Sequence, residues 1–394
     1  MEVCDHAGRT GLGECVAFAT DWYLPETIEQ DVRLLREIIG PKVLTEVYLH
    51  PREVAASFAD MPEVATFPLA LGALEPALWD LYGKIIKKPL WQLIAEEADL
   101  PVSAAEAPAT PTTPAAPATP VPPTTPTARA TSSGAPSAQP SHDRVIFAGA
   151  FVGMGTPAET VETVRRCVEA GYKRVKLKIA PGALACVQEV RAVFPHLVLT
   201  LDANQSFTEH DMAELRALDA CGAAWIEEPL DLSRISQRGG KSAVYAQLAR
   251  LQRALSTPIC LDESFSCAAE AYEALEHPEL RCFAIKIGKF GGVSGALDFV
   301  RTAQTRGARV WMGGMYDTGI SKRLHAAFQM LPGIDVPGDI GATSRYFSTD
   351  VCDPPYEVTR GNVTLNTEGN AYGLGCVLCR PALANVQVNQ FEIA

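Results

Sequence analysis

The sequence lacks the features that mark a nucleic-acid or membrane partner. It has 394 residues with a formal net charge of −12, and no run of lysines or arginines. Phosphate binding needs clustered positive charge, so we expect no nucleic-acid partner. No apolar run reaches the roughly 18–20 residues that cross a bilayer, so we expect no membrane partner. Residues 1–14 lack the basic start and apolar core of a signal peptide, which predicts a cytoplasmic protein.

Cysteine frameworks and nucleotide motifs are missing as well. The eleven cysteines are scattered without regular spacing, which is typical of free thiols in a reducing compartment. Cys376-x-x-Cys379 has no second pair and no nearby histidine, so we interpret it as structural rather than as a zinc site. No Gly-x-Gly-x-x-Gly follows a predicted strand, which argues against a nicotinamide enzyme.

Composition divides the chain into four parts. Residues 1–95 predict a small α+β domain, and residues 96–143 are rich in Ala, Pro and Thr. Such a segment buries too little apolar surface to offset its ordering entropy, so we predict a disordered linker or insertion. Residues 144–332 alternate between strands and helices, which indicates an α/β barrel. Residues 333–394 are predicted to end the barrel and return to the first domain.

Charged residues stand where five successive predicted strands end. Lys176 and Lys178 lie in the first strand, and Asp202, Glu227, Asp262 and Lys286 follow the next four. The intervals match one strand, one helix and two loops, which together need about 25–35 residues. The carboxyl ends of parallel strands meet at one face of a (β/α) barrel. The series therefore predicts that these side chains converge at a barrel mouth.

The paired lysines suit proton transfer. Strand alternation puts Val175 and Leu177 on the face toward the helices, so Lys176 and Lys178 point into the barrel. Two lysines about 6 Å apart repel by roughly 2–3 kcal/mol at an effective dielectric near 20. Burial also favours the neutral form. We therefore expect a lysine here to be partly neutral at about pH 7–8, as a general base must be.

The three carboxylates suit a metal ion. Each carboxylate alone is more typical of a helix N-cap than of a metal ligand, but the spacing of the set favours the metal, because Asp202, Glu227 and Asp262 cannot all ionise in one place without a cation. Oxygen ligands without histidine or cysteine favour Mg²⁺, with Mn²⁺ as the alternative. Lys286 comes from the wall opposite Lys178. Opposed lysines beside a metal suit removal of a proton α to the carboxylate of a small-molecule substrate.

At these residues the chain resembles the enolase superfamily, in its muconate-lactonizing subgroup. The motifs that carry the resemblance are Lys176-Leu-Lys178, Asp202-Ala-Asn204, Glu227-Glu-Pro229, Asp262-Glu263-Ser264 and Ile285-Lys286. Residues 175–182, 313–319 and 337–346 are similar to the branch that holds o-succinylbenzoate synthases and N-acylamino acid racemases. The resemblance implies a modified (β/α)7β TIM-type barrel with an α+β capping domain.

The resemblance also implies residue roles. Lys178 would be the base and Lys286 its partner, with Mg²⁺ on Asp202, Glu227 and Asp262. The implied supporting or substrate-binding residues are Lys176, Asn204, Glu263, Gly313, Gly314, Met315 and Asp317. The implied reaction is the syn-dehydration of 2-succinyl-6-hydroxy-2,4-cyclohexadiene-1-carboxylate to o-succinylbenzoate, in menaquinone biosynthesis.

The chain departs from the family pattern in four places. It starts almost at the Gly11-Leu-Gly13-Glu14 segment, so we expect a shortened cap, and the Ala/Pro/Thr-rich insertion is foreign to the family. Asp317 stands where the branch usually has Glu, and Phe151 where a small polar residue is common. Two other hypotheses stay open: an N-acylamino acid racemase or dipeptide epimerase, and a shortened non-catalytic homologue. The sequence also leaves open whether the chain forms a homo-oligomer.

Overall fold

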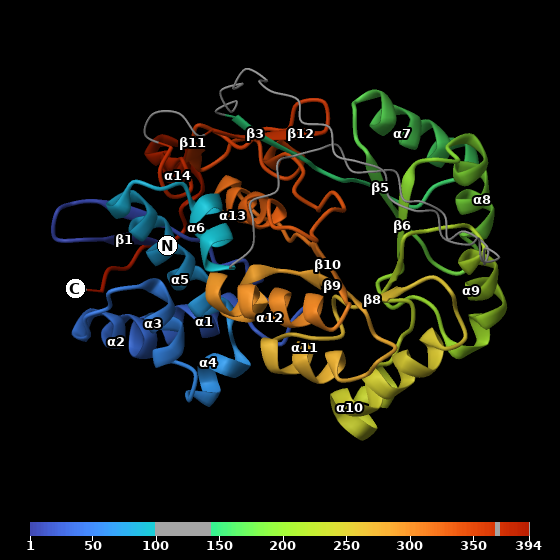
Figure 1. The fold of residues 1–394 in the computed structure, drawn as a ribbon, viewed down its shortest axis with the longest axis horizontal. Coiled ribbons are helices and arrows are strands. Elements are labelled where there is room, and N and C mark those ends of the chain that lie inside the picture. Colours follow the sequence, from blue (N-terminus) through green and yellow to red (C-terminus); the bar gives the residue numbers. More distant parts are fainter. Residues whose placement is uncertain (99–142, 367–370, 394) are drawn as a thin grey trace, which may run out of the picture.

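The computed structural model describes residues 1–98, 143–366 and 371–393. The Ala/Pro/Thr-rich segment predicted over 96–143 lies almost wholly outside these residues. Figure 1 shows the barrel strands flanked by helices, with the N-terminal elements and α14 gathered on one side of the barrel. Among the helices of the described ranges, none combines the length and apolar character that a membrane span needs.

The barrel is closed by parallel pairing. A five-stranded sheet runs β4 (Ala150–Val152), β5 (Arg174–Lys178), β6 (Val198–Asp202), β7 (Ile226–Glu227) and β8 (Ile259–Cys260). A bridge between Leu261 and Phe283 continues it to the pair β9 (Cys282–Ile285) and β10 (Arg309–Met312). The ring closes at Gly338, whose carbonyl accepts the Gly149 N–H at 2.7 Å, while the Asp339 N–H donates to Met312 at 2.8 Å.

Each barrel strand is followed by a helix. The helices are α7 (Pro157–Glu169), α8 (Leu184–Val193), α9 (Met212–Asp219), α10 (Ser233–Gln252), α11 (Ala268–Leu275), α12 (Val293–Thr305) and α13 (Gly319–Gln329). In the first of them, Thr156 and Glu159 form a capping box and Val164 is fully buried, so a polar start and an apolar stripe define the helix. Within the described residues, seven strand–helix units and the closing bridge make the predicted (β/α)7β barrel.

Strand register brings the charged residues to one level. Lys178 lies opposite Asp202 across β5 and β6, and Asp202 lies opposite Glu227 across β6 and β7. Asp262 follows β8 after one intervening residue, and Lys286 directly follows β9. The strand-end series therefore meets at one mouth, as the spacing predicts.

The cap is mostly helical. It contains the hairpin β1 (Glu2–Cys4) and β2 (Thr10–Leu12), then α1 (Ile28–Leu34), the π-helix η1 (Leu35–Ile39), α2 (Gly40–Thr45), α3 (Pro51–Ser57), α4 (Pro62–Thr66), α5 (Leu69–Ile86) and α6 (Leu90–Glu97). The Gly-x-Gly segment packs directly on α5. A Cβ on Gly11 or Gly13 would lie 2.0 Å from the carbonyl oxygen of Ala77 or Ala73, so neither position accepts a side chain.

The C-terminal segment returns to the cap. β12 (Asn362–Asn366) pairs antiparallel with β3 (Asp143–Phe147), and β11 (Cys352–Asp353) pairs with β13 (Val377–Leu378), which precedes α14 (Arg380–Val386). The buried Asp80 carboxylate of α5 accepts the N–H groups of Leu12 at 2.8 Å and of Leu374 at 2.7 Å. One acidic side chain of the cap therefore joins segments from both ends of the chain.

Candidate active site

The β5 wall of the mouth presents two lysines to Asp202. Lys178 Nζ donates to Asp202 Oδ2 at 2.6 Å and also to Asn204 Oδ1, and its side chain is 34% exposed. Lys176 Nζ lies deeper, 3.1 Å from Asp202 Oδ2 and 2.6 Å from Asp339 Oδ2. Of the two predicted lysines, Lys178 is the one that a molecule entering the mouth can reach.

The expectation that repulsion leaves a lysine here partly neutral is wrong for Lys176. Burial alone would lower the pKa of Lys176, but Asp339, Glu227 and Asp202 outweigh burial and hold that pKa well above its usual value. The predicted pKa considered only the repulsion between the two lysines. It did not include the attraction of the carboxylates that the fold brings beside them. Lys176 therefore acts as a fixed positive charge in the barrel.

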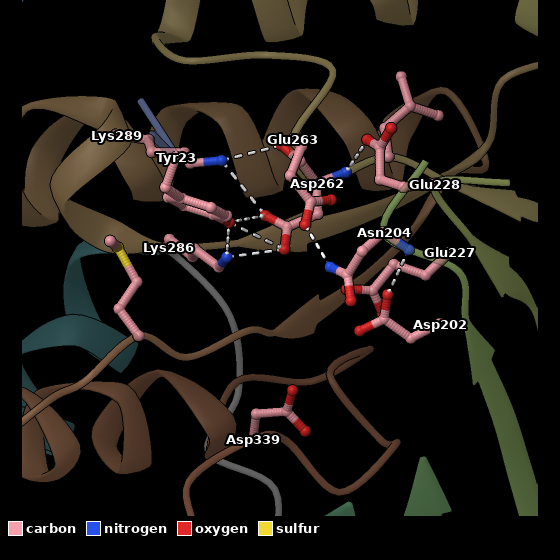
Figure 2. Close-up of polar contacts among 12 residues, drawn as sticks. Tyr23, Asp202, Asn204, Glu227, Glu228, Asp262, Glu263, Lys286, Lys289 and Asp339 are labelled. Atoms are coloured by element: carbon pink, nitrogen blue, oxygen red, sulfur yellow. Dashed lines mark hydrogen bonds and ion pairs between the residues drawn. The ribbon is translucent and has the colours of Figure 1, made fainter. Parts of the chain in front are cut away.

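The β9 wall presents two other lysines to Asp262 (Figure 2). Lys286 Nζ donates to Asp262 Oδ2 at 2.7 Å, and Lys289 Nζ lies 3.2 Å from Oδ1 of the same carboxylate. Burial would raise the pKa of Asp262, but Lys286 and Lys289 outweigh it and hold that pKa below its usual range. Asp262 is therefore ionised at neutral pH. Lys286 keeps a raised pKa because Asp262 and Glu263 outweigh its own burial.

Glu227 lies between the two walls and is poorly satisfied. Its Oε1 is 3.5 Å from Lys176 Nζ, and its Oε2 is buried without a hydrogen-bond partner. Burial, and then the charge of Asp202, raise the pKa of Glu227 well above its usual value. A buried carboxylate oxygen without a donor, beside two further carboxylates, is a site at which a hard cation gains oxygen ligands. Asp202, Glu227 and Asp262 therefore fit a divalent metal in their chemistry.

Their present side-chain arrangement is set by the lysines. Across residues 1–98, 143–366 and 371–393, no three His, Cys, Asp or Glu side chains stand close enough together to hold a metal as they are. Asp202 pairs with the lysines of β5, and Asp262 pairs with Lys286 and Lys289. The three carboxylates thus reach the same mouth, with each outer one turned toward the lysines of its own wall.

Asn204 and Glu263 link the two walls (Figure 2). Asn204 Nδ2 donates to Glu263 Oε1 at 2.6 Å, and the Asn204 backbone has a φ of +41°, which is uncommon for a residue other than glycine. Burial, and then the charges of Asp262 and Glu228, raise the pKa of Glu263 to about 7. Asn204 and Glu263 therefore lie next to the charged cluster, and the supporting role that the resemblance implies for them stays a prediction.

The predicted substrate-pocket residues after β10 lie in two environments. A Cβ on Gly313 would be 3.3 Å from the Cγ and Cε atoms of Lys286, and one on Gly314 would be 2.6 Å from the Asp339 carbonyl oxygen. Met315 packs with Leu24 and Leu69 of the cap. Asp317 is buried and lines the same small cavity as Lys286 and Met315; it accepts the Met315 N–H at 2.9 Å and lies 3.2 Å from Lys322 Nζ.

Four further residues of the cluster were not among the site residues predicted from the sequence. Glu228 holds the loop of Asp262, because its carboxylate accepts the Asp262 N–H at 2.6 Å and the Ser264 N–H at 2.7 Å. Glu228 directly follows Glu227 in the Glu-Glu-Pro motif, and this position was the signal in the sequence that could have identified it. Asp339 pairs with Lys176 and with the buried Arg174, and the Pro-Gly-Asp motif marked it. The other two are Lys289, three residues after Lys286, and the cap residue Tyr23, which no motif marked.

Fold and site together define the class of protein: a capped (β/α)7β barrel whose mouth is lined by lysines and carboxylates. The family model described as "Enolase C-terminal domain-like" matches residues 159–382, and the chain belongs to this family, within the enolase superfamily. It is 32% identical to an o-succinylbenzoate synthase of Geobacillus stearothermophilus, over 92% of this chain and 81% of that protein. It is 31% identical to an N-succinylamino acid racemase of Thermus thermophilus, over 97% of this chain and 88% of that protein.

Solved structures agree on the fold. A crystal structure described as an unknown member of the enolase superfamily from Enterococcus faecalis has a TM-score of 0.78 and 29% identity, covering 98% of this chain and 88% of that one. A muconate lactonizing enzyme from Pseudomonas putida has a TM-score of 0.73 at 20% identity, covering 98% of this chain and 92% of that one. The second likeness concerns the fold alone.

Proposed function

We propose that the chain is an o-succinylbenzoate synthase that dehydrates 2-succinyl-6-hydroxy-2,4-cyclohexadiene-1-carboxylate for menaquinone synthesis. The observation that carries the proposal is the pair of lysines on opposite walls, each held by a different strand-end carboxylate. A proton α to a carboxylate is weakly acidic, so its removal needs a base on one side and positive charge around the developing enediolate. The relatives named above support the same branch of chemistry.

In this proposal Lys178 is the base. It is the more exposed lysine of β5, and Asp202 and Asn204 hold its Nζ at the mouth. Lys286 faces it as a fixed cation that stabilises charge on the forming ring. Asp202, Glu227 and Asp262 would hold Mg²⁺, with Mn²⁺ as the alternative. The bound ion supplies positive charge to the substrate carboxylate as negative charge develops there.

The rim of the mouth offers apolar contacts for a ring. Phe151 stacks on Tyr346 with centroids 6.3 Å apart, and Tyr316 meets Tyr346 edge-on at 4.9 Å. The Arg345 guanidinium lies over the Phe151 ring at 3.8 Å, so one positive charge also belongs to this rim. A substrate with a ring and a succinyl carboxylate matches an aromatic surface that includes a cation. Phe151, a departure from the family pattern, is part of that surface.

The second candidate is an N-succinylamino acid racemase. A racemase needs one proton-transfer group on each side of the α carbon. Lys178 and Lys286, on opposite walls, supply these two groups. The similarity to the Thermus thermophilus racemase supports this alternative. Both reactions begin with the same proton abstraction, and they differ in whether a hydroxide leaves or a proton returns.

A direct assay separates the candidates. Purified full-length protein with Mg²⁺ and the cyclohexadiene carboxylate should produce o-succinylbenzoate, followed by its ultraviolet absorbance. Absence of turnover together with racemisation of an N-succinyl amino acid would replace the first proposal by the second. Absence of both reactions, with Mg²⁺ or Mn²⁺, would instead support the non-catalytic homologue.

A further inference from the structure

Tyr23 brings a cap side chain into the lysine–carboxylate cluster. It lies in the loop between β2 and α1, where Phe18 meets its ring edge-on at 6.0 Å and Trp22 lies 5.5 Å away. The same loop packs Leu24 against Met315 of the barrel. The ring is therefore held by its cap neighbours, and its hydroxyl is directed at the β9 wall (Figure 2).

The hydroxyl bonds to both members of the Lys286–Asp262 pair. It donates to Asp262, with its oxygen 3.3 Å from Oδ1 and 3.2 Å from Oδ2, and it accepts a hydrogen bond from Lys286 Nζ. The ring itself stacks on the cations, 4.6 Å from Lys286 Nζ and 5.5 Å from Lys289 Nζ. Burial, and then the charge of Asp262, raise the pKa of Tyr23 well above its usual value, so the group remains a phenol.

Two partners fix the direction of an ammonium group. A lysine has three N–H donors in a tetrahedral arrangement, so holding two of them determines where the third points. Lys286 gives one donor to Asp262 and one to Tyr23. Lys178 gives one to Asp202 and one to Asn204, and both of those partners belong to the barrel. The two opposed lysines thus differ in the origin of their second partner.

We propose that Tyr23 is a positioning residue that orients Lys286, so that proton transfer on the Lys286 face depends on the cap, whereas transfer on the Lys178 face depends on the barrel. The inference rests on the proposed function in its second form, the racemase, in which the two lysines serve opposite faces of one α carbon. It adds one residue, Tyr23, and the claim that the two lysines depend on different domains for their orientation.

Tyr23→Phe isolates the hydroxyl, because phenylalanine keeps the ring and its stacking on Lys286. The matched control is Tyr48→Phe, which removes a cap hydroxyl that bonds Glu46 Oε2 at 2.7 Å and Ser57 Oγ at 3.2 Å, apart from the cluster. Proton–deuteron exchange at the α carbon of each enantiomer of an N-succinyl amino acid is followed by NMR in D₂O with Mg²⁺. Lys178→Ala and Lys286→Ala establish which enantiomer each lysine serves.

We expect Tyr23→Phe to slow exchange of the Lys286-dependent enantiomer about tenfold or more, because a hydrogen bond to a charged group is lost. Exchange of the Lys178-dependent enantiomer should stay within about twofold of the parent, as should both rates in Tyr48→Phe. A general structural defect would slow both faces together. Equal slowing of both enantiomers, or no slowing of either, would overturn the positioning role.

A second measurement does not depend on turnover. Reductive methylation of the full-length chain, mapped by mass spectrometry, gives the ratio of labelling at Lys286 to that at Lys178. Tyr23→Phe should raise this ratio severalfold, and Tyr48→Phe should leave it unchanged. An unchanged ratio in Tyr23→Phe overturns the inference. If the parent protein neither exchanges protons nor forms o-succinylbenzoate, the proposed function fails, and the labelling ratio still decides the role of Tyr23.

Discussion

The β5 wall and the β9 wall of the barrel mouth hold two lysines each, but in different surroundings. On β5 the lysine nearer the opening is 34% exposed and its deeper neighbour is 8% exposed. On the β9 side Lys286 and Lys289 are 7% and 0% exposed, and the cap covers them through Tyr23. The β5 wall is therefore accessible to a reacting molecule, whereas the β9 wall is an enclosed source of positive charge.

Removing the exposed lysine should have the largest effect. We predict that Lys178→Ala lowers the rate of proton abstraction by about 10³–10⁴-fold, within the range for loss of a general base. The substitution leaves the thermal midpoint nearly unchanged, because the side chain is partly exposed. Initial rates and circular dichroism melting test this, with the exposed Lys173→Ala as control. Retained activity in Lys178→Ala would remove it as the base.

The second-largest effect is expected from a substitution in the charge network beneath the β5 wall. Asp339 Oδ1 lies 2.5 Å from the buried Arg174 and its Oδ2 lies 2.6 Å from Lys176, so Asp339→Asn leaves two buried cations short of a partner. Breaking such a pair costs about 3–5 kcal/mol of unfolding free energy. Urea unfolding measures this cost, with Asp298→Asn as the control, because the Asp298 side chain is 51% exposed in its ion pair with Arg52. Equal stability of the two variants would contradict the network.

The pH dependence of this network has a definite sign. Burial would raise the pKa of Asp339, but Lys176 and Arg174 outweigh burial and hold it below its usual range. The stabilisation is therefore fully present above the unfolded pKa of about 3.9 and is lost as pH falls through the folded pKa. Asp339→Asn should accordingly flatten the acid limb of the stability profile.

A substitution of Glu227, which lies between the two walls, tests whether a metal ion binds there. Its folded pKa is raised, so at neutral pH its charged form destabilises the fold, and Glu227→Gln without metal should be as stable as the parent or about 1–3 kcal/mol more stable. Millimolar Mg²⁺ should raise the melting temperature of the parent, whereas the variant should show a smaller shift. Equal Mg²⁺-induced shifts would exclude Glu227 as a metal ligand. The matched control is Glu279→Gln, because the ion pair of Glu279 with Arg253 precedes β8 and β9 and so lies at the barrel end opposite the mouth.

The smallest effect belongs to a histidine that lines the same small cavity as Lys286. Burial, against the opposing charge of Asp317, lowers the pKa of His325 to about 4. Its stabilisation is present above the unfolded pKa of about 6.5 and is lost as pH falls toward the folded value, by about 2 kcal/mol between pH 7 and pH 5. Urea unfolding of His325→Gln at these two pH values should lack that loss. An unchanged pH difference would mean that His325 is not buried in its neutral form.

The sequence predicted the parts of this arrangement that follow from periodicity. Alternation in β5 placed Lys176 and Lys178 inside the barrel, and the spacing of Asp202, Glu227 and Asp262 placed them at one mouth, because parallel strands end at a common face. The barrel and the enolase superfamily were predicted and are confirmed. The roles assigned to the individual site residues stay predictions.

What the sequence could not give are contacts between remote segments. Tyr23 reaches Asp262 across 239 positions, and Asp339 reaches Arg174 across 165, so neither pairing has a local pattern. The same gap explains the wrong expectation for Lys176. Its state depends on Asp339, which enters only when Gly338 closes the ring.

The inward face of β5 also bears on how the chain finds its register. Arg174, Lys176 and Lys178 alternate with Val175 and Leu177. Arg174 and Lys176 share the Asp339 carboxylate, and Lys178 pairs with Asp202. A slip of one residue during folding would turn these cations into the apolar layer under the helices and put valine and leucine among carboxylates. Misaligned pairing of this strand is therefore penalised by charge as well as by apolar packing. The cations of β5, one of which is the proposed base Lys178, thus also favour the correct strand register.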